Sequence, residues 1–241
     1  MDSSTTAPRP RTVFTRRVAS LLAGLSAALL AASAAHAGSV QITVQAADGK
    51  PAADTVVLLQ PRGAWSAQPL PAPAVVTQKN IRFVPYVTVV PVGGTVRFVN
   101  EDAYDHHVRS LPGGPLGTVA PARQFELRLP AVAGSKPASS DLKLDVPGII
   151  ALGCHLHGSM RGHVYVSTTP WHAVTDANGR ATLHGVPEGE AEVRLWHPDQ
   201  LTDQPATRVQ VAAAAPAVAE AKLNFAPRRR PTIAPRDQYN Y

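Results

Sequence analysis

The sequence has one cysteine and two methionines in 241 residues, and aromatic residues make up only 5% of it. A single cysteine cannot form an internal disulfide, which excludes a small scaffold held together by disulfide bonds. Beyond the N-terminal region, no stretch has the apolar periodicity of an amphipathic helix longer than two turns. The sequence therefore also argues against a helical bundle.

Excess positive charge is confined to the two ends of the chain, which has 23 basic and 17 acidic residues in all. Residues 1–37 and residues 226–241 each contain four arginines and one aspartate, which leaves 15 residues of each sign in residues 38–225. A balanced body of this kind lacks the basic face of a nucleic-acid-binding protein, so no nucleic-acid partner is expected. The tail, residues 226–241, is rich in proline and arginine and is expected to be disordered.

The first 37 residues have the three-part layout of a secretory signal peptide. Four arginines precede an Ala/Leu-rich run at residues 18–35, and AHA ends just before Gly38. One alternative is an uncleaved anchor, since the run approaches the ~20 residues that a span requires. Another open point is the export route, because Arg16 and Arg17 hint at a twin-arginine signal. We expect cleavage before Gly38, a periplasmic location and no membrane span in the mature protein.

The mature chain alternates apolar and polar residues in many short runs, which end at glycine, proline and asparagine turns. This spacing predicts an all-β protein built as a sandwich or barrel. The dipeptide Asn178-Gly179 predicts a β-hairpin, and residues 65–74 read as a Pro/Ala linker.

Residues 44–59 resemble the opening strands of the carboxypeptidase regulatory-like, transthyretin-type sandwich, and residues 175–196 resemble a later part of the same fold. The stretch between them has the size of a complete small β domain, which suggests that it is inserted between the halves of an outer sandwich. The alternative is one continuous array with a C-terminal hairpin extension. The predicted divisions are a signal peptide (1–37), first outer strands and linker (38–75), an inserted domain (76–168), the remaining outer strands (169–225) and a basic tail (226–241).

The only cysteine lies in the stretch GCHLHGSMRGHVYV, residues 153–166. Cys154, His157 and Met160 are three residues apart, as in a tight loop that folds around one ion between two strands. A thiolate, imidazoles and a thioether form a soft donor set that suits copper in both of its common oxidation states. In an oxidising compartment a free thiol persists best when it is buried or occupied.

A further histidine is available in RFVNEDAYDHHVRS, residues 97–110. Strand alternation places His106 and Val108 on one face and His107 on the other. Asn100 is either a turn residue or a brace for the metal loop. His155 is expected to point away from the metal if Cys154 points toward it.

The stretches VPVGGTVRFVNEDAYDHHV and GIIALGCHLHGSMRGHVYV resemble the cupredoxins, the plastocyanin and amicyanin group of type 1 copper proteins. The wider order of FELRL, the cysteine loop and TDANGR…LWHP resembles periplasmic plastocyanin-like proteins of the kind labelled methylamine utilization proteins. The resemblance implies a Greek-key β-sandwich and one type 1 copper per chain. It also implies a ligand set, which consists of His106, Cys154, His157 and Met160.

The sequence departs from the plastocyanin pattern on either side of the first predicted ligand. Plastocyanins commonly have proline before this histidine and asparagine after it, whereas this chain has Asp105 and His107. His107 therefore stays open as the alternative first ligand.

The resemblance implies a one-electron carrier that is not an enzyme, is a monomer, and meets a redox partner such as a cytochrome or dehydrogenase. The alternative is a periplasmic copper-handling protein without an electron-transfer role. A multicopper oxidase is disfavoured, because the mature sequence has only eight histidines and His155-Leu156-His157 is its one H-x-H pattern. Zinc also accepts cysteine and histidine, but Met160 argues against it.

Overall fold

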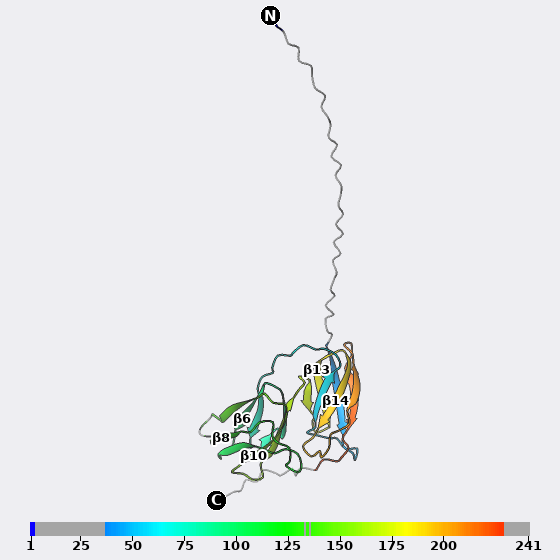
Figure 1. Ribbon diagram of the computed structural model, residues 1–241. Coiled ribbons are helices and arrows are strands. Elements are labelled where there is room, and N and C mark those ends of the chain that lie inside the picture. The colour runs from blue at the N-terminus through cyan, green and yellow to red at the C-terminus, as the bar shows by residue number, and fades with distance from the viewer. Residues whose placement is uncertain (3–36, 133, 135, 229–241) are drawn as a thin grey trace. The chain divides into compact units, whose positions relative to one another are not determined.

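The computed structural model describes residues 1–2, 37–132, 134 and 136–228. These residues form sixteen strands in four sheets and no helix, which confirms the predicted all-β class (Figure 1). The predicted signal peptide lies outside the described residues except for residues 1–2 and 37. In the described part of the chain there is no helix with the length and hydropathy of a membrane span.

Nine consecutive strands form two sheets, here called the inner sheets, in the orders β4-β3-β6-β9 and β5-β11-β10-β7-β8. All nine lie between residues 74 and 167, in the middle of the sequence. Their bounds are β3 (Ala74–Gln78), β4 (Phe83–Val84), β5 (Val87–Pro91), β6 (Gly94–Asn100), β7 (His106–Leu111), β8 (Glu126–Leu129), β9 (Ala138–Leu144), β10 (Gly148–Cys154) and β11 (Arg161–Ser167).

The other seven strands form the outer sheets, in the orders β13-β1-β16 and β12-β2-β14-β15. Two of them precede the inner strands in sequence and five follow them. Independent folding of residues 76–168 stays a prediction. The outer strands are β1 (Ala37–Gln45), β2 (Val56–Pro61), β12 (His172–Val174), β13 (Arg180–Pro187), β14 (Gly189–Trp196), β15 (Thr207–Val211) and β16 (Ala217–Lys222).

Each pair of sheets encloses its own hydrophobic core, built from alternate residues of its strands. On β1 every second residue is buried, and Val40, Ile42 and Val44 enter the outer core. On β6 the same alternation buries Val96 and Phe98 in the inner core. Burial of one such side chain contributes roughly 1.5–3 kcal/mol, so a period of two fixes which face of each strand turns inward.

Strand β2 departs from alternation, because Val56, Val57, Leu58 and Leu59 are all buried. Val57 and Leu59 enter the outer core. Val56 and Leu58 instead join a third cluster with Val87 of the inner strand β5. A strand covered on both faces reads as a continuous apolar run, which explains the sequence VVLL.

The prediction of a β-hairpin at Asn178-Gly179 is wrong. The turn connects β12 to β13, and these two strands belong to different sheets, with β12 paired to β2 and β13 paired to β1. The physical reason lies at Gly179, whose carbonyl accepts a hydrogen bond from the amide of Val44 on β1. A Cβ at Gly179 would clash with the Val44 carbonyl oxygen, so this turn is held against a third strand.

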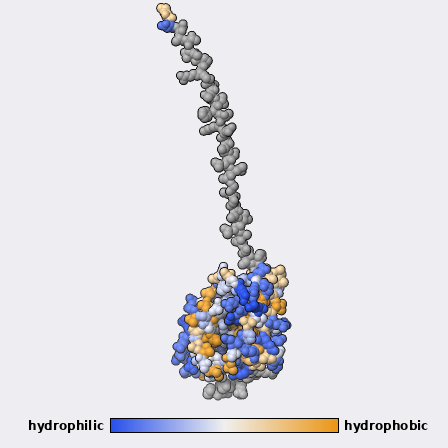
Figure 2. All heavy atoms as spheres, turned by 45° about the vertical axis from the view of Figure 1, so that its right-hand side comes forward, coloured by the Kyte–Doolittle hydropathy of each residue, from blue (hydrophilic) through white to orange (hydrophobic). Residues whose placement is uncertain are grey.

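Strands β15 and β16 complete the outer sheets from a segment rich in alanine, where the sequence pattern had predicted no particular strand. Strand β16 pairs in parallel with β1, and Val209, Val211 and Ala221 enter the outer core. Burial against existing strands outweighs the low strand propensity of alanine here. Figure 2 shows a mainly hydrophilic face with smaller hydrophobic patches, as is usual for a protein surface.

The start of the predicted basic tail, residues 226–228, is described, and residues 229–241 are not. The guanidinium of Arg228 donates to the carboxylate of Asp199 over 2.6 and 3.0 Å, and its backbone amide donates to the same carboxylate. The ion pair raises the pKa of Arg228 above its ordinary value.

His163 on β11 lies in the contact between inner and outer strands. Its Nε2 is 3.1 Å from the hydroxyl of Tyr86, and its ring is 6.0 Å from that of Trp196. Its Nδ1 finds no hydrogen-bond partner among the described residues. Burial lowers the pKa of His163 to about 4.

The pKa of His163 predicts a loss of stability in acid. Between pH 6.5 and 4 the unfolded chain binds a proton at this residue and the folded chain does not, so the free energy of unfolding should fall by up to about 3 kcal/mol as the pH falls. Denaturant titrations at pH 7 and pH 4.5 measure the drop, and His163→Gln should reduce it. Burial also lowers the pKa values of His172 and His197, so part of the drop should remain. An identical pH profile in H163Q would contradict the prediction.

Candidate metal centre

Antiparallel pairing of β7 with β10 brings the two predicted halves of the site together. Cys154, the last residue of β10, lies opposite Val108. His106 is two residues before Val108 and therefore faces the same side of the sheet. Both His106 and Cys154 are nearly inaccessible, with 1% and 3% of their surface exposed. Residues 155–160 then form the loop that leads into β11.

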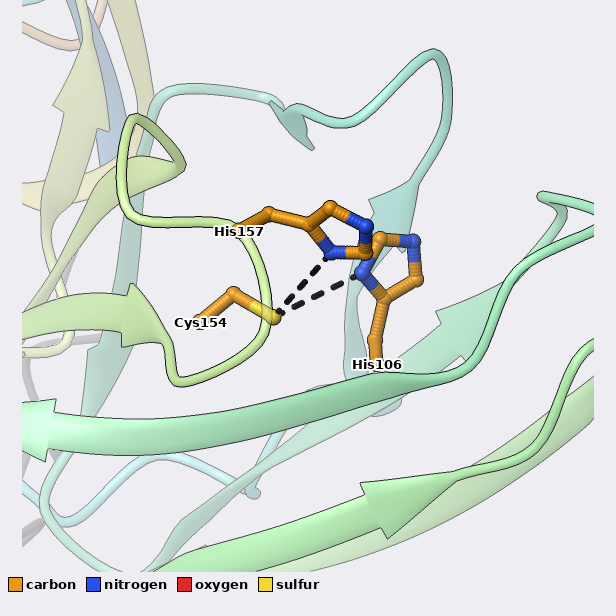
Figure 3. A group of neighbouring side chains, drawn as sticks. All are labelled: His106, Cys154 and His157. Carbon is orange, nitrogen blue, oxygen red and sulfur yellow. Dashed lines mark hydrogen bonds between the residues drawn. The ribbon is translucent and has the colours of Figure 1, made fainter. Parts of the chain in front are cut away.

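The nitrogen and sulfur atoms of three side chains converge in this position (Figure 3). Cys154 Sγ lies 3.7 Å from His106 Nδ1 and 3.5 Å from His157 Nδ1, and the three ligand atoms are within 4.8 Å of one another. With bonds of about 2.3 Å to sulfur and 2.0 Å to nitrogen, donors about 120° apart would be separated by roughly 3.7 Å. The two separations between sulfur and nitrogen therefore fit ligands of one ion as well as they fit direct hydrogen bonds.

A buried carboxylate fixes the orientation of His106. Asp102 Oδ2 lies 2.9 Å from His106 Nε2. An ionised carboxylate only accepts, so Nε2 carries a hydrogen, and Nδ1 is the nitrogen that faces Cys154, where it can interact with the thiol or bind a metal. The same carboxylate accepts hydrogen bonds from the backbone amides of Asn80 and Ile81, at 2.6 and 2.9 Å. The predicted ligand is thus held by a group that is itself held by the backbone.

Asn100 braces the turn between β6 and β7. Its side-chain oxygen accepts from the amide of Asp102, and its amide group donates to the carbonyls of Tyr104, Leu129 and Pro130. Asn100 is fully buried. Of the two interpretations of this residue, the bonds favour a brace, and it stabilises the segment that carries Asp102 and His106 rather than the cysteine loop.

The surroundings of Cys154 lower the pKa of its thiol and so favour the ionised form. Burial alone raises its pKa, but hydrogen bonds from His106, the His107 backbone and His157 outweigh burial and bring the pKa to about 6. Burial lowers the pKa of His106, whereas its bonds to Cys154 and Asp102 raise it, and the net shift is upward. A thiolate is the form that binds metal, so the local charges favour ligation.

Met160 lies in the same buried cluster as Cys154, with 1% of its surface exposed. Its backbone amide donates to the carbonyl of His157 over 3.0 Å, which closes the loop between the two residues. A buried thioether in the same core cluster as Cys154 is the remaining member of the donor set that suits copper.

His107 and His155 do not join this group. His107 is half-buried on the opposite face of β7, where its Nε2 lies 3.2 Å from the carboxylate of Glu126. His155 stacks on His107, with ring centroids 5.6 Å apart. The structure thus brings His106 to Cys154 and places His107 on the outer side.

Sequence reasoning missed Asp102. The available signal was an acidic residue four positions before a candidate histidine, in a turn that follows a strand. A carboxylate next to a metal-binding histidine is a common arrangement, because it orients the ring.

No protein-family model matches the chain, and no curated protein matches it. Among solved structures it is similar to a Cu-containing nitrite reductase (NirK) from Thermus scotoductus SA-01, with 25% identity, a TM-score of 0.34, and coverage of 45% of this chain but only 25% of that one. A variant of amicyanin with Cu(I) is 25% identical, with a TM-score of 0.30, and the match covers 39% of this chain and 82% of the amicyanin chain. An oxidised amicyanin variant is 23% identical, with a TM-score of 0.31, and the match covers 45% of this chain and 98% of the amicyanin chain. Such low TM-scores do not by themselves assign a function to the chain.

The bond to His106 makes Asp102 a test of the site. Asp102→Asn keeps the size of the side chain but removes its charge and one of its two acceptor oxygens, so the side chain can no longer accept from His106 and from both backbone amides. Copper affinity should fall by about 10- to 100-fold, as measured by competition with a chelator. Glu101→Gln is the matched control, because the adjacent Glu101 is exposed and its carboxylate pairs with Lys79 at the surface. Equal affinities in D102N and E101Q would contradict this role.

The thiol can be followed directly in the metal-free protein. The ultraviolet absorbance of the thiolate should titrate with a midpoint near pH 6, the value to which the hydrogen bonds bring the pKa of Cys154, rather than near the ~8.5 of a free thiol. His106→Leu removes one of these bonds and should move the midpoint upward. Cys154→Ser should abolish the signal. A wild-type midpoint above pH 8 would show that the thiol is not activated.

Proposed function

We propose that this protein holds one copper ion at a type 1 centre and carries single electrons between other proteins. The observation that supports this most is the convergence of His106 Nδ1, Cys154 Sγ and His157 Nδ1, with Met160 buried in the same core cluster as Cys154. Copper bound there would alternate between Cu(I) and Cu(II), for which a soft and borderline donor set is suited. His106, Cys154 and His157 would hold the ion, and Met160 would be a further, weaker donor.

The protein part of the centre is arranged in advance of binding. Cys154 is fixed by the β7–β10 ladder, and His106 by the carboxylate of Asp102. Ligands held by strands and by buried hydrogen bonds need to move little when the charge of an ion changes, which favours rapid electron exchange. The low pKa of the thiol favours the binding step instead, because a thiolate needs no deprotonation when the ion binds.

His157 is the ligand with access to solvent, and it would be the exit for an electron. Its neighbour Leu156 is 57% exposed, and the exposed Tyr104 packs edge-on against the His157 ring at 6.4 Å. A small apolar surface around a ligand suits the brief and weak contacts of redox partners. We propose a cytochrome or dehydrogenase as this partner, and a monomeric, periplasmic carrier exported by the signal peptide.

Loading the purified mature protein with Cu(II) tests the proposal. We expect an intense visible band from thiolate-to-copper charge transfer and the EPR signal of a type 1 site. Cys154→Ser should abolish the band, because no other thiol is present. His106→Ala should lose it as well, whereas His107→Ala, on the other face of the same strand, should keep it.

A colourless protein with an ordinary tetragonal copper signal would overturn the type 1 assignment. Blue protein whose Cu(I) is readily taken by chelators, with slow electron exchange, would instead indicate copper handling without electron transfer.

A further inference from the structure

The outer face of the β7–β10 pair carries a second histidine pair. The amide of His155 donates to the carbonyl of His107 over 2.9 Å, which continues the ladder one step beyond Cys154 and Val108. Residues one step along a strand face the opposite side, so these two histidines turn away from His106 and Cys154. Their rings stack with centroids 5.6 Å apart and planes inclined by 28°.

A carboxylate from the next strand reaches the same place. Strand β8 pairs with β7 so that Glu126 lies opposite Arg109, diagonal to His107. Its Oε2 is 3.2 Å from His107 Nε2. Glu126 is 62% exposed at its side chain, and His155 is exposed. His107 therefore has an imidazole on one side, that of His155, and a carboxylate on the other, that of Glu126, and both of these groups are exposed.

We infer that His107, His155 and Glu126 form a second metal site, which takes a borderline divalent transition cation such as Cu²⁺ or Zn²⁺. Two imidazoles and one carboxylate match the ligand preference of these ions. Two bonds of 2.0–2.1 Å at a tetrahedral angle place their donor atoms roughly 3.3 Å apart, close to the separation of His107 Nε2 from Glu126 Oε2. Directly opposed residues of antiparallel strands have Cβ atoms about 5 Å apart, within the reach of two imidazoles to one ion.

This site is separate from the centre on the inner face. It uses no thiol and no thioether, and two of its three donors, His155 and Glu126, are exposed, so an ion there would exchange readily and would show no thiolate charge transfer. The inference rests on the outer-face geometry alone and does not depend on the proposed electron-transfer function. The two sites are nevertheless adjacent in the chain, because His155 directly follows Cys154 and His107 directly follows His106.

The test begins with the mature protein loaded with one equivalent of Cu(II), followed by titration with a second equivalent. We expect the second equivalent to bind with a tetragonal, nitrogen-coordinated EPR signal. His155→Ala should weaken this second binding by about tenfold or more, since even partners of ligands cost that much. Glu126→Gln, at an exposed position, should weaken it by less.

His184→Ala is the matched control. His184 is also an exposed strand histidine, but the residue opposite it on β1 is Ser39, so it has no second imidazole across the ladder. This variant should bind the second equivalent like the wild type.

Absence of a second bound equivalent, or equal affinity in H155A and wild type, would overturn the inference. Loss of the thiolate band in H155A without a change in the second binding would also overturn it, because His155 would then act only through Cys154. A protein without the thiolate band whose EPR signal still depends on His155 would contradict the proposed function and support the second site.

Discussion

The antiparallel pairing of β7 with β10 is the constraint on which every metal-binding feature of this chain depends. It joins segments 48 residues apart, since Cys154 is opposite Val108 and its thiol lies beside His106. The alternation of the two strands then sorts four side chains by face, with His106 and Cys154 inside and His107 and His155 outside. A shift of the register by one residue would exchange the faces and bury the wrong pair. One ladder thus determines both which donors are buried and which are open to solvent.

The turn before β7 fixes the orientation of His106, which the strand pairing only brings close to Cys154. Asn100 holds the turn through its side-chain bonds, and the turn presents Asp102 to His106. Two backbone amides on the far side, from Asn80 and Ile81, keep the carboxylate in place. Burial of a charged group is costly unless such partners exist, so this network is a sign of specific positioning rather than general stability.

The sequence predicted the parts of this arrangement that depend on local order. Alternation placed His106 and His107 on opposite faces of one strand, and the family resemblance favoured His106 as the ligand. The three-residue spacing of Cys154, His157 and Met160 predicted a tight loop. Asp102 was missed because its partners are backbone amides that lie 21 and 22 residues earlier in the chain. The Asn178-Gly179 hairpin was predicted wrongly because a turn dipeptide reports only the local bend, whereas the core decides which sheet the next strand joins. Glu126 and His107 meet through the β7–β8 register, which no local pattern encodes.

The distribution of the outer strands along the chain has a consequence for the order of synthesis. Strand β1 pairs with β13 and β16, and β2 pairs with β12 and β14. Each of these early strands can therefore pair only after more than 100 further residues have been synthesised. The inner strands, in contrast, find all of their partners within residues 74–167. Contacts between such distant segments form slowly, and unpaired apolar strands are prone to aggregate. The segment that carries the candidate metal centre can therefore be complete while the outer strands that precede it in the sequence still lack their partners.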